Sequence, residues 1–137
     1  MKSRMFAMLS SLTLLTAAAV MAQDYGWMKA TIPFAFHAGG KVLPAGVYRV
    51  HLDRGLGVMA IRGTDGGAFF QAIRVEAKNV PERSALVFNQ YNQTYYLSEI
   101  KNAGVVLEWQ LSKPKLEREL ALNGAPAPPV EVTLTRP

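Results

Sequence analysis

The sequence predicts an all-β protein: an antiparallel β-sandwich or flattened barrel of seven to eight strands, with one short helix in the C-terminal region. Two observations favour this class. Short runs of alternating apolar and polar residues are separated by turn residues about every ten positions, a spacing typical of sandwiches and barrels. A helical pattern occurs once, late in the chain, and no segment repeats at a fixed period.

The first 22 residues have the pattern of a secretory signal peptide. Lys2 and Arg4 precede an apolar run, and Val20 and Ala22 occupy the small-residue positions before a cleavage site. A permanent membrane anchor is the less favoured alternative, because the run is shorter than the ~20 residues that a spanning helix needs. We therefore expect export to the periplasm or the extracellular space, with no stable membrane span after cleavage. Residues 23–137 then form a single β-sandwich domain.

The composition excludes several function classes. The chain has no cysteine, so a disulfide scaffold, thiol catalysis and cysteine-ligated metal are excluded. Without Lys2 and Arg4, 13 basic and 10 acidic side chains remain, a net charge of +3. The two signs are mixed along the chain, so we expect no nucleic-acid partner. No pattern indicates a cofactor, and none sets the oligomeric state.

The N-terminal half is expected to form four strands. A proline on the outer face of the first strand favours an edge position; its inward face comprises Ala30, Ile32, Phe34 and Phe36, with Pro33 opposite. The second strand points Tyr48, Val50 and Leu52 inward and Arg49 and His51 outward, and a short third strand spans residues 58–62. In the fourth strand one face carries Phe69, Ile73 and Val75, and the other carries Arg74, Glu76 and Lys78. We expect Phe69 to fill the core.

The C-terminal half contains a predicted hairpin, two further strands and the helix. The runs "ALVFNQY" and "TYYLSEI" flank Asn92-Gln93, which predicts a tight turn, and "VVLEWQL" predicts the next strand. The helix is expected over residues 112–122, with Ser112 as N-cap and Pro114 in the first turn. Leu116 and Leu120 give it an apolar stripe. The last strand is "VEVTLTR".

The stretch "FHAGGKVLPAGVYRV" first suggests a phosphate-binding loop, because Gly40 precedes Lys41. A phosphate loop also needs an earlier glycine, a hydroxyl residue after the lysine and a following helix. Ala35 and Val42 occupy those two positions, so we exclude a nucleotide site. Gly39-Gly40 instead predicts a two-residue hairpin turn, and Leu43-Pro44-Ala45-Gly46 predicts a type I turn.

The same stretch carries a resemblance. Together with "LVFNQYNQTYYLSEI" and "SKPKLEREL", it resembles a group of small uncharacterised secreted bacterial proteins. Their pattern is a Pro-Phe strand, an LPAG-x-Y turn and strand, an aromatic hairpin and an ERE(L) helix. The resemblance covers most of residues 23–137. It implies a secreted β-domain and no known activity, and it assigns no functional residues.

Two separate groups of side chains could each serve an enzyme. His51 and Asp53 share one strand face, and His37 ends the preceding strand, so the three side chains could serve a metal-dependent or hydrolytic enzyme. Arg49 on the same face opposes metal binding, and a solvated surface is favoured over a metal site. Glu99 and Glu108 could form a glycosidase-like pair if their strands are adjacent, although two exposed acids are far commoner.

The predicted hairpin is the best functional candidate. Its binding residues would be Tyr91, Asn92, Gln93, Tyr95 and Tyr96, because aromatic faces with nearby amides are what a sugar ring or a protein partner contacts. The alternative is cross-strand packing within the sheet. Alternation sends Tyr95 and Tyr96 to opposite faces, so one of them is expected in the core.

Arginines on the outer sheet face form a second candidate. A basic stripe of Arg49, Arg62, Arg74 and Lys78 could meet an anionic envelope polymer or lipid headgroups, or could be a plain solvated face. The leading hypothesis is an exported, non-enzymatic binding or structural module that contacts an envelope protein or a polysaccharide. The alternatives are the small enzyme described above and a barrel that carries an apolar ligand.

Overall fold

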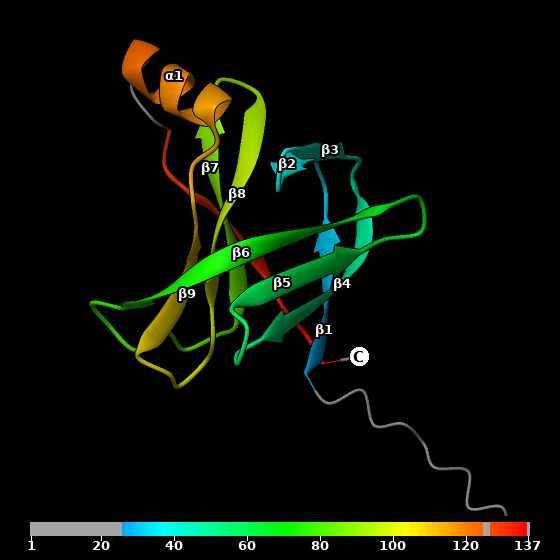
Figure 1. Cartoon of the computed structure of the whole chain (residues 1–137), viewed down its shortest axis with the longest axis vertical. Coiled ribbons are helices and arrows are strands. Elements are labelled where there is room, and N and C mark those ends of the chain that lie inside the picture. Colours follow the sequence, from blue (N-terminus) through cyan, green and yellow to red (C-terminus); the bar gives the residue numbers. More distant parts are fainter. Residues whose placement is uncertain (1–25, 125–126, 137) are drawn as a thin grey trace, which may run out of the picture.

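Ten strands and one helix make up the described part of the chain, residues 26–124 and 127–136 of the computed structural model (Figure 1). The predicted signal peptide lies outside these residues. The elements are β1 (Trp27–Ile32), β2 (Phe36–Ala38), β3 (Lys41–Leu43), β4 (Gly46–Asp53), β5 (Val58–Arg62), β6 (Gly67–Glu76), β7 (Ala85–Tyr91), β8 (Thr94–Lys101), β9 (Leu107–Leu111), α1 (Lys115–Asn123) and β10 (Val130–Thr133).

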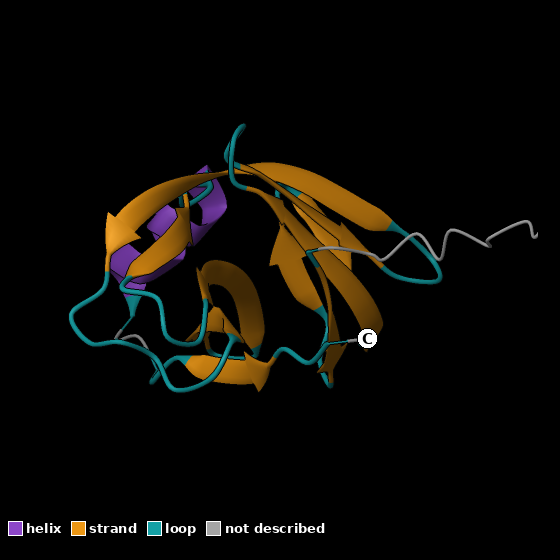
Figure 2. Cartoon of the chain, turned by 90° about the horizontal axis from the view of Figure 1, so that it is seen from below, coloured by secondary structure: helices purple, strands orange, loops and turns teal. Residues whose placement is uncertain are grey.

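The strands form one continuous sheet that folds over on itself. Its order is β1-β4-β5-β6-β9-β8-β2-β3, and β7 pairs with both β8 and β10. The long strand β6 joins the two halves, because its first part pairs with β5 and its second part with β9. Lys29 of β1 forms an isolated bridge to Thr135, and Figure 2 shows the strands curving around the interior. The barrel is not closed, since this bridge is not a ladder.

The predicted fold class is confirmed: the protein is an all-β sandwich or flattened barrel with one short helix. The strand number is higher than the predicted seven to eight. The expected first strand is interrupted after Ile32 at Pro33, and pairing resumes at Phe36. The hairpin of β2 and β3 adds two short strands, each of three residues.

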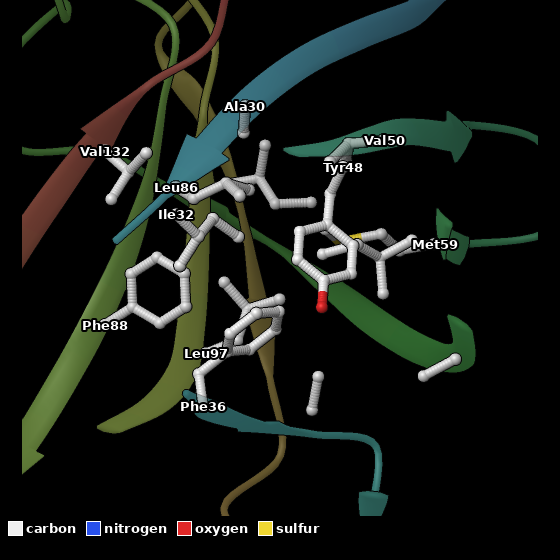
Figure 3. Packing of buried hydrophobic residues seen from close by; sticks show 14 of the residues in the cluster. Ala30, Ile32, Phe36, Tyr48, Val50, Met59, Leu86, Phe88, Leu97 and Val132 are labelled. Atoms are coloured by element: carbon white, nitrogen blue, oxygen red, sulfur yellow. The ribbon is translucent and has the colours of Figure 1, made fainter. Parts of the chain in front are cut away.

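The core lies between the two halves of the folded sheet (Figure 3). Phe36 and Phe88 are fully buried and meet edge to face, with ring centroids 5.4 Å apart. Around them pack apolar side chains from most of the strands, among them Ala30, Ile32, Tyr48, Val50, Met59, Leu86, Leu97 and Val132. An apolar interior of this kind supplies most of the free energy of folding in a domain that has no disulfide.

The face of β6 differs from the prediction. Ala68 and Ala72 are buried, whereas Phe69 and Ile73 are 63% and 64% exposed. Alternation along the strand places Arg74 on the face of the two alanines. The prediction was wrong because both faces of β6 carry apolar residues, and the face with small alanines is the one that packs closely against the interior.

The Gly39-Gly40 hairpin turn in the stretch "FHAGGKVLPAGVYRV" is confirmed, whereas the chain between β3 and β4 bends at Ala45 and its type I geometry stays a prediction. Gly39 and Gly40 have φ of 56° and 80°, and they join Ala38 to its partner Lys41, as a two-residue hairpin turn requires. The Tyr48 hydroxyl donates a hydrogen bond to the carbonyl of Pro44. This bond ties the buried tyrosine ring to the turn four residues earlier, which gives the LPAG-x-Y pattern a structural reason.

The helix begins later than predicted and buries a different residue. Pro114 is its N-cap, in extended conformation, and no side chain caps the helix. Ser112 therefore does not have the predicted N-cap role. Helical geometry is disfavoured at Lys113, because this residue precedes Pro114, and the helix begins only at Lys115. Leu116 is 53% exposed, and the buried residue is Glu117, at 1%. The helix therefore docks on the hairpin of β7 and β8 through a carboxylate.

Candidate functional site

A cavity of about 490 Å³ lies where the β2–β3 turn, β6, β8, β9 and the start of α1 meet. This volume is within the range of small-molecule sites, roughly 300–1,000 Å³. Most of its lining is apolar or aromatic, and four side chains offer hydrogen bonds. The lining includes Phe69, Phe70, Leu97, Leu111, Pro114 and Leu116, with His37, Gln71, Tyr96 and Ser112 as the polar members.

Close packing of the glycine turn on β6 forms one wall of the cavity. A Cβ atom at Gly39 would lie 3.0 Å from the Phe70 ring and 3.2 Å from the Phe69 carbonyl oxygen. Glycine therefore lets the β2–β3 turn approach the backbone of β6. Gly39 and Gly40 of the turn that resembled a phosphate loop are thus part of the wall of the cavity.

Tyr96 is a lining residue of the cavity and has a buried polar group. Its side chain is buried, at 2% exposure, and within the described residues its hydroxyl has no hydrogen-bond partner. The His37 ring stacks on the Tyr96 ring, with centroids 4.4 Å apart. Burial, and then the charge of Glu117, raises the pKa of Tyr96. The phenol therefore stays protonated at neutral pH and is a hydrogen-bond donor.

Glu117 anchors the helix beside this tyrosine. Its carboxylate accepts a hydrogen bond of 2.9 Å from the Asn89 amide and one of 3.3 Å from the Tyr91 hydroxyl. Burial, followed by the charge and the hydrogen bond of Glu117, raises the pKa of Tyr91. These contacts fix the first turn of α1, which carries Leu116, against the end of the hairpin. They therefore hold one wall of the cavity in place.

The predicted hairpin turn is confirmed, but its aromatic side chains face inward. Asn92 has φ of 56° between the paired residues Tyr91 and Thr94. Tyr91 and Tyr96 are buried, and Tyr95 is half-buried and stacks on Phe34 at 3.9 Å. Asn92 and Gln93 are exposed at the tip. Tyr96 is the core member of the Tyr95–Tyr96 pair, as expected for one of the two, and a binding role for the hairpin stays a prediction.

The predicted basic stripe divides between two faces. Arg49 lies directly opposite Arg62 in the ladder of β4 and β5, so these two residues share a face. Arg74 lies opposite Trp109, and its guanidinium is 5.7 Å from the centre of that ring. Since Arg74 has the parity of the buried alanines of β6, it does not extend the row that contains Arg49.

His37, His51 and Asp53 have separate environments. His37 stacks on Tyr96, whereas His51 stacks on Trp27 at 5.0 Å. Asp53 accepts hydrogen bonds from the amides of Gly55 and Leu56, so its carboxylate stabilises the turn after β4. Across residues 26–124 and 127–136, no three His, Asp or Glu side chains form a group that could hold a metal ion.

The acid pair considered from the sequence lies on adjacent strands. Glu99 of β8 is opposite Gln110 of β9, whose amide donates to the Glu99 carboxylate over 3.4 Å. Burial, and then the charge of Glu108, raises the pKa of Glu99, while the Lys101 charge lowers it. Neither carboxylate lines the cavity, so this pair is separate from the candidate site.

Sequence reasoning missed Glu117, Gln71, Ser112 and Phe69 as site residues. The signal for Glu117 was its spacing of three residues from Leu120, which places both on one side of a helix. Phe69 was assigned to the core on hydrophobicity alone. The exposure of Phe69 in the folded protein indicates a binding role better than its hydrophobicity does, since large exposed apolar residues beside a concavity are typical of binding sites.

Comparison with known proteins gave no match to a family model, a curated protein or a solved structure. Among the described residues, no helix is long and apolar enough to cross a membrane.

Proposed function

We propose that this chain is an exported, non-enzymatic binding module that holds a sugar unit of a polysaccharide in the cavity between α1 and the β2–β3 turn. The observation that carries this proposal is a cavity of about 490 Å³ whose lining combines the aromatic residues Phe69, Phe70 and Tyr96 with the polar residues His37, Gln71 and Ser112. The pattern of the first 22 residues supports export.

Sugar rings have an apolar face and a rim of hydroxyl groups. The cavity offers complementary residues: Phe69 and Phe70 for the apolar face, and Gln71, Ser112 and Tyr96 for the hydroxyls. His37 lines the same space and stacks on Tyr96. Aromatic platforms flanked by a few polar groups are typical of such recognition.

A matched pair of variants on β6 tests the proposal. Phe69 and Ile73 are nearly equally exposed, but only Phe69 is a lining residue of this cavity. Binding of neutral cello-, xylo- and malto-oligosaccharides would be measured by calorimetry with wild type, Phe69→Ala and Ile73→Ala. We expect at least one of the three series to bind, and Phe69→Ala to weaken binding about tenfold, with Ile73→Ala unchanged.

Two results would contradict the proposal: no binding of any oligosaccharide, or equal losses in the two variants. The alternative function, a carrier of an apolar ligand, is favoured by the contribution of Phe70, Leu97 and Leu111 to the same lining. It predicts that a hydrophobic fluorescent probe binds in the cavity and that oligosaccharides do not displace it. Displacement of the probe by an oligosaccharide would favour the sugar site.

A further inference from the structure

The outer face of β6 carries a line of exposed side chains, most of them apolar. Phe69 and Ile73 are 63% and 64% exposed, and Val75 is partly exposed. Alternation along the strand places the exposed Gln71 on the same face. These four residues, which we call the β6 patch, span about 20 Å of strand. Large apolar side chains gathered on one exposed face are typical of an interaction surface.

Charges of opposite sign lie at the two ends of the β6 patch. β5 and β9 pair with opposite edges of β6. In these ladders Arg62 of β5 is opposite Gly67, and Glu108 of β9 is opposite Val75. Because directly opposite residues share a face of the sheet, both charges lie on the face of the patch. The patch therefore has a cationic end and an anionic end.

Both charges are available to a partner. Arg62 is exposed and Glu108 is partly exposed, and within the described residues neither forms a salt bridge. The Arg62 guanidinium lies 5.6 Å from the centre of the Phe69 ring, which places it beside the patch. At the other end, burial and then the Glu108 charge raise the pKa of Glu99, and the Lys101 charge offsets this only in part. The anionic end therefore has an excess of negative charge.

The positions of these charges match a reversed copy of the same patch. Arg62 is at the level of Gly67, four residues before Gln71, and Glu108 is at the level of Val75, four residues after it. The two charges also lie on opposite edges of β6. A two-fold axis at Gln71 that reverses the strand direction therefore brings Arg62 of each copy to Glu108 of the other.

The apolar residues follow the same symmetry. Phe69 and Ile73 are each two residues from Gln71, on opposite sides, so the axis brings Phe69 of one copy to the region of Ile73 of the other. An isologous interface is made by the same patch on both subunits. Sheets that pack face to face commonly cross at about 30°, which allows the two strands to lie across each other diagonally. The β6 patch is thus complementary to itself.

We propose that the β6 patch is the contact surface of a two-fold dimer of this chain, with two Arg62–Glu108 ion pairs between the copies. A second copy is favoured as the occupant because the charges of the patch complement the reversed patch itself. This inference goes beyond the proposed function and does not depend on it. Phe69 belongs both to the patch and to the lining of the cavity, whereas Ile73 is not a lining residue, so Ile73 is used in the test.

Charge reversal tests the pairing. Sedimentation velocity of the purified protein between about 1 and 500 µM should show a dimer of the wild type. Arg62→Glu or Glu108→Arg places like charges at both ion pairs and should weaken association at least about tenfold. The double variant restores opposite charges and should return the dissociation constant to within about threefold of wild type. Arg74→Glu makes the same change in charge on the other face of β6 and should change the constant less than about twofold.

The apolar part of the patch is tested separately. Ile73→Ser should abolish the dimer in this concentration range, whereas Leu122→Ser, which changes a more exposed leucine on α1, should leave it unchanged. The urea midpoint of each variant shows whether the fold is kept. A wild type that stays monomeric throughout, or a dimer that Ile73→Ser leaves intact, would overturn the inference. A double charge variant that associates no better than the single variants would also overturn it, because the two charges would then not meet.

Discussion

Two buried tyrosines of one hairpin should differ in how much stability the protein loses when their hydroxyl groups are removed. Tyr91 and Tyr96 are 6% and 2% exposed. The Tyr91 hydroxyl donates to the Glu117 carboxylate over 3.3 Å, whereas the Tyr96 hydroxyl has no partner among the described residues. Replacement by phenylalanine keeps each ring and deletes only the hydroxyl, so the comparison isolates the hydrogen bond.

The magnitudes follow from these partners. Tyr91→Phe removes a hydrogen bond to a buried carboxylate and should lower the free energy of unfolding by about 1.5–3 kcal/mol. Tyr96→Phe removes a desolvated, unsatisfied hydroxyl and should leave the free energy of unfolding unchanged or raise it by about 1 kcal/mol. Under the proposed function, Tyr96→Phe should also weaken oligosaccharide binding, because the donor that meets the ligand is lost.

Urea denaturation at neutral pH, followed by tryptophan fluorescence, measures both changes. The shift of the midpoint gives the difference in stability where the slope of the transition is unchanged. A loss of stability in Tyr96→Phe as large as that in Tyr91→Phe would refute the reasoning. It would mean that the Tyr96 hydroxyl is satisfied in the folded protein and is not held ready for a ligand.

Three further predictions concern the helix, a turn and alkaline pH. Glu117→Ala should cost about 3–5 kcal/mol in urea denaturation, because it leaves the half-buried amide of Asn89 and the buried hydroxyl of Tyr91 without their acceptor. The exposed Glu119→Ala, which loses only a 4.0 Å contact with Lys115, should cost less than about 0.5 kcal/mol, and equal costs would contradict a carboxylate anchor. Gly63→Ala should lower the free energy of unfolding by roughly 2–3 kcal/mol, and the melting temperature by several degrees. The reason is that a Cβ at this position would lie 2.6 Å from the buried Tyr48 ring. An unchanged melting temperature would show that the ring moves freely. Stability should fall above about pH 10, because the folded state holds three phenol protons more tightly than the unfolded chain. This contribution is complete below the unfolded-state pKa and is lost as the pH rises through the folded-state values. A urea midpoint at pH ~11 equal to that at pH ~8 would contradict it. The tyrosines with raised pKa are Tyr48, Tyr91 and Tyr96.

The turns were predictable because their chemistry is local. Gly39-Gly40 and Asn92 adopt the positive φ values that their residue types permit, and each turn then fixes the register of its hairpin. The alternation of Ala30, Ile32 and Phe36 also predicted the buried face of the first strands correctly. In each case a few consecutive residues contain the information that decides the structure.

The face of β6 and the packing of α1 were not predictable in this way. Phe69 and Phe70 are adjacent and equally hydrophobic, so strand alternation admits both registers. The choice depends on whether Ala68 and Ala72 or the larger Ile73 fit the space opposite. For the helix, Leu116 is the obvious inward residue, but the hairpin presents Asn89 and Tyr91 as donors. A carboxylate satisfies those donors and a leucine does not.

The polar docking of the helix connects stability with the candidate site. An apolar stripe on α1 would bury Leu116 and remove it from the cavity, whereas anchoring through Glu117 leaves Leu116 at 53% exposure on the cavity wall. The hydrogen bonds of Glu117 also satisfy Tyr91, whereas the hydroxyl of Tyr96 has no partner within residues 26–124 and 127–136. The same carboxylate therefore fixes the first turn of α1, with Leu116 on the cavity wall, and pairs with Tyr91.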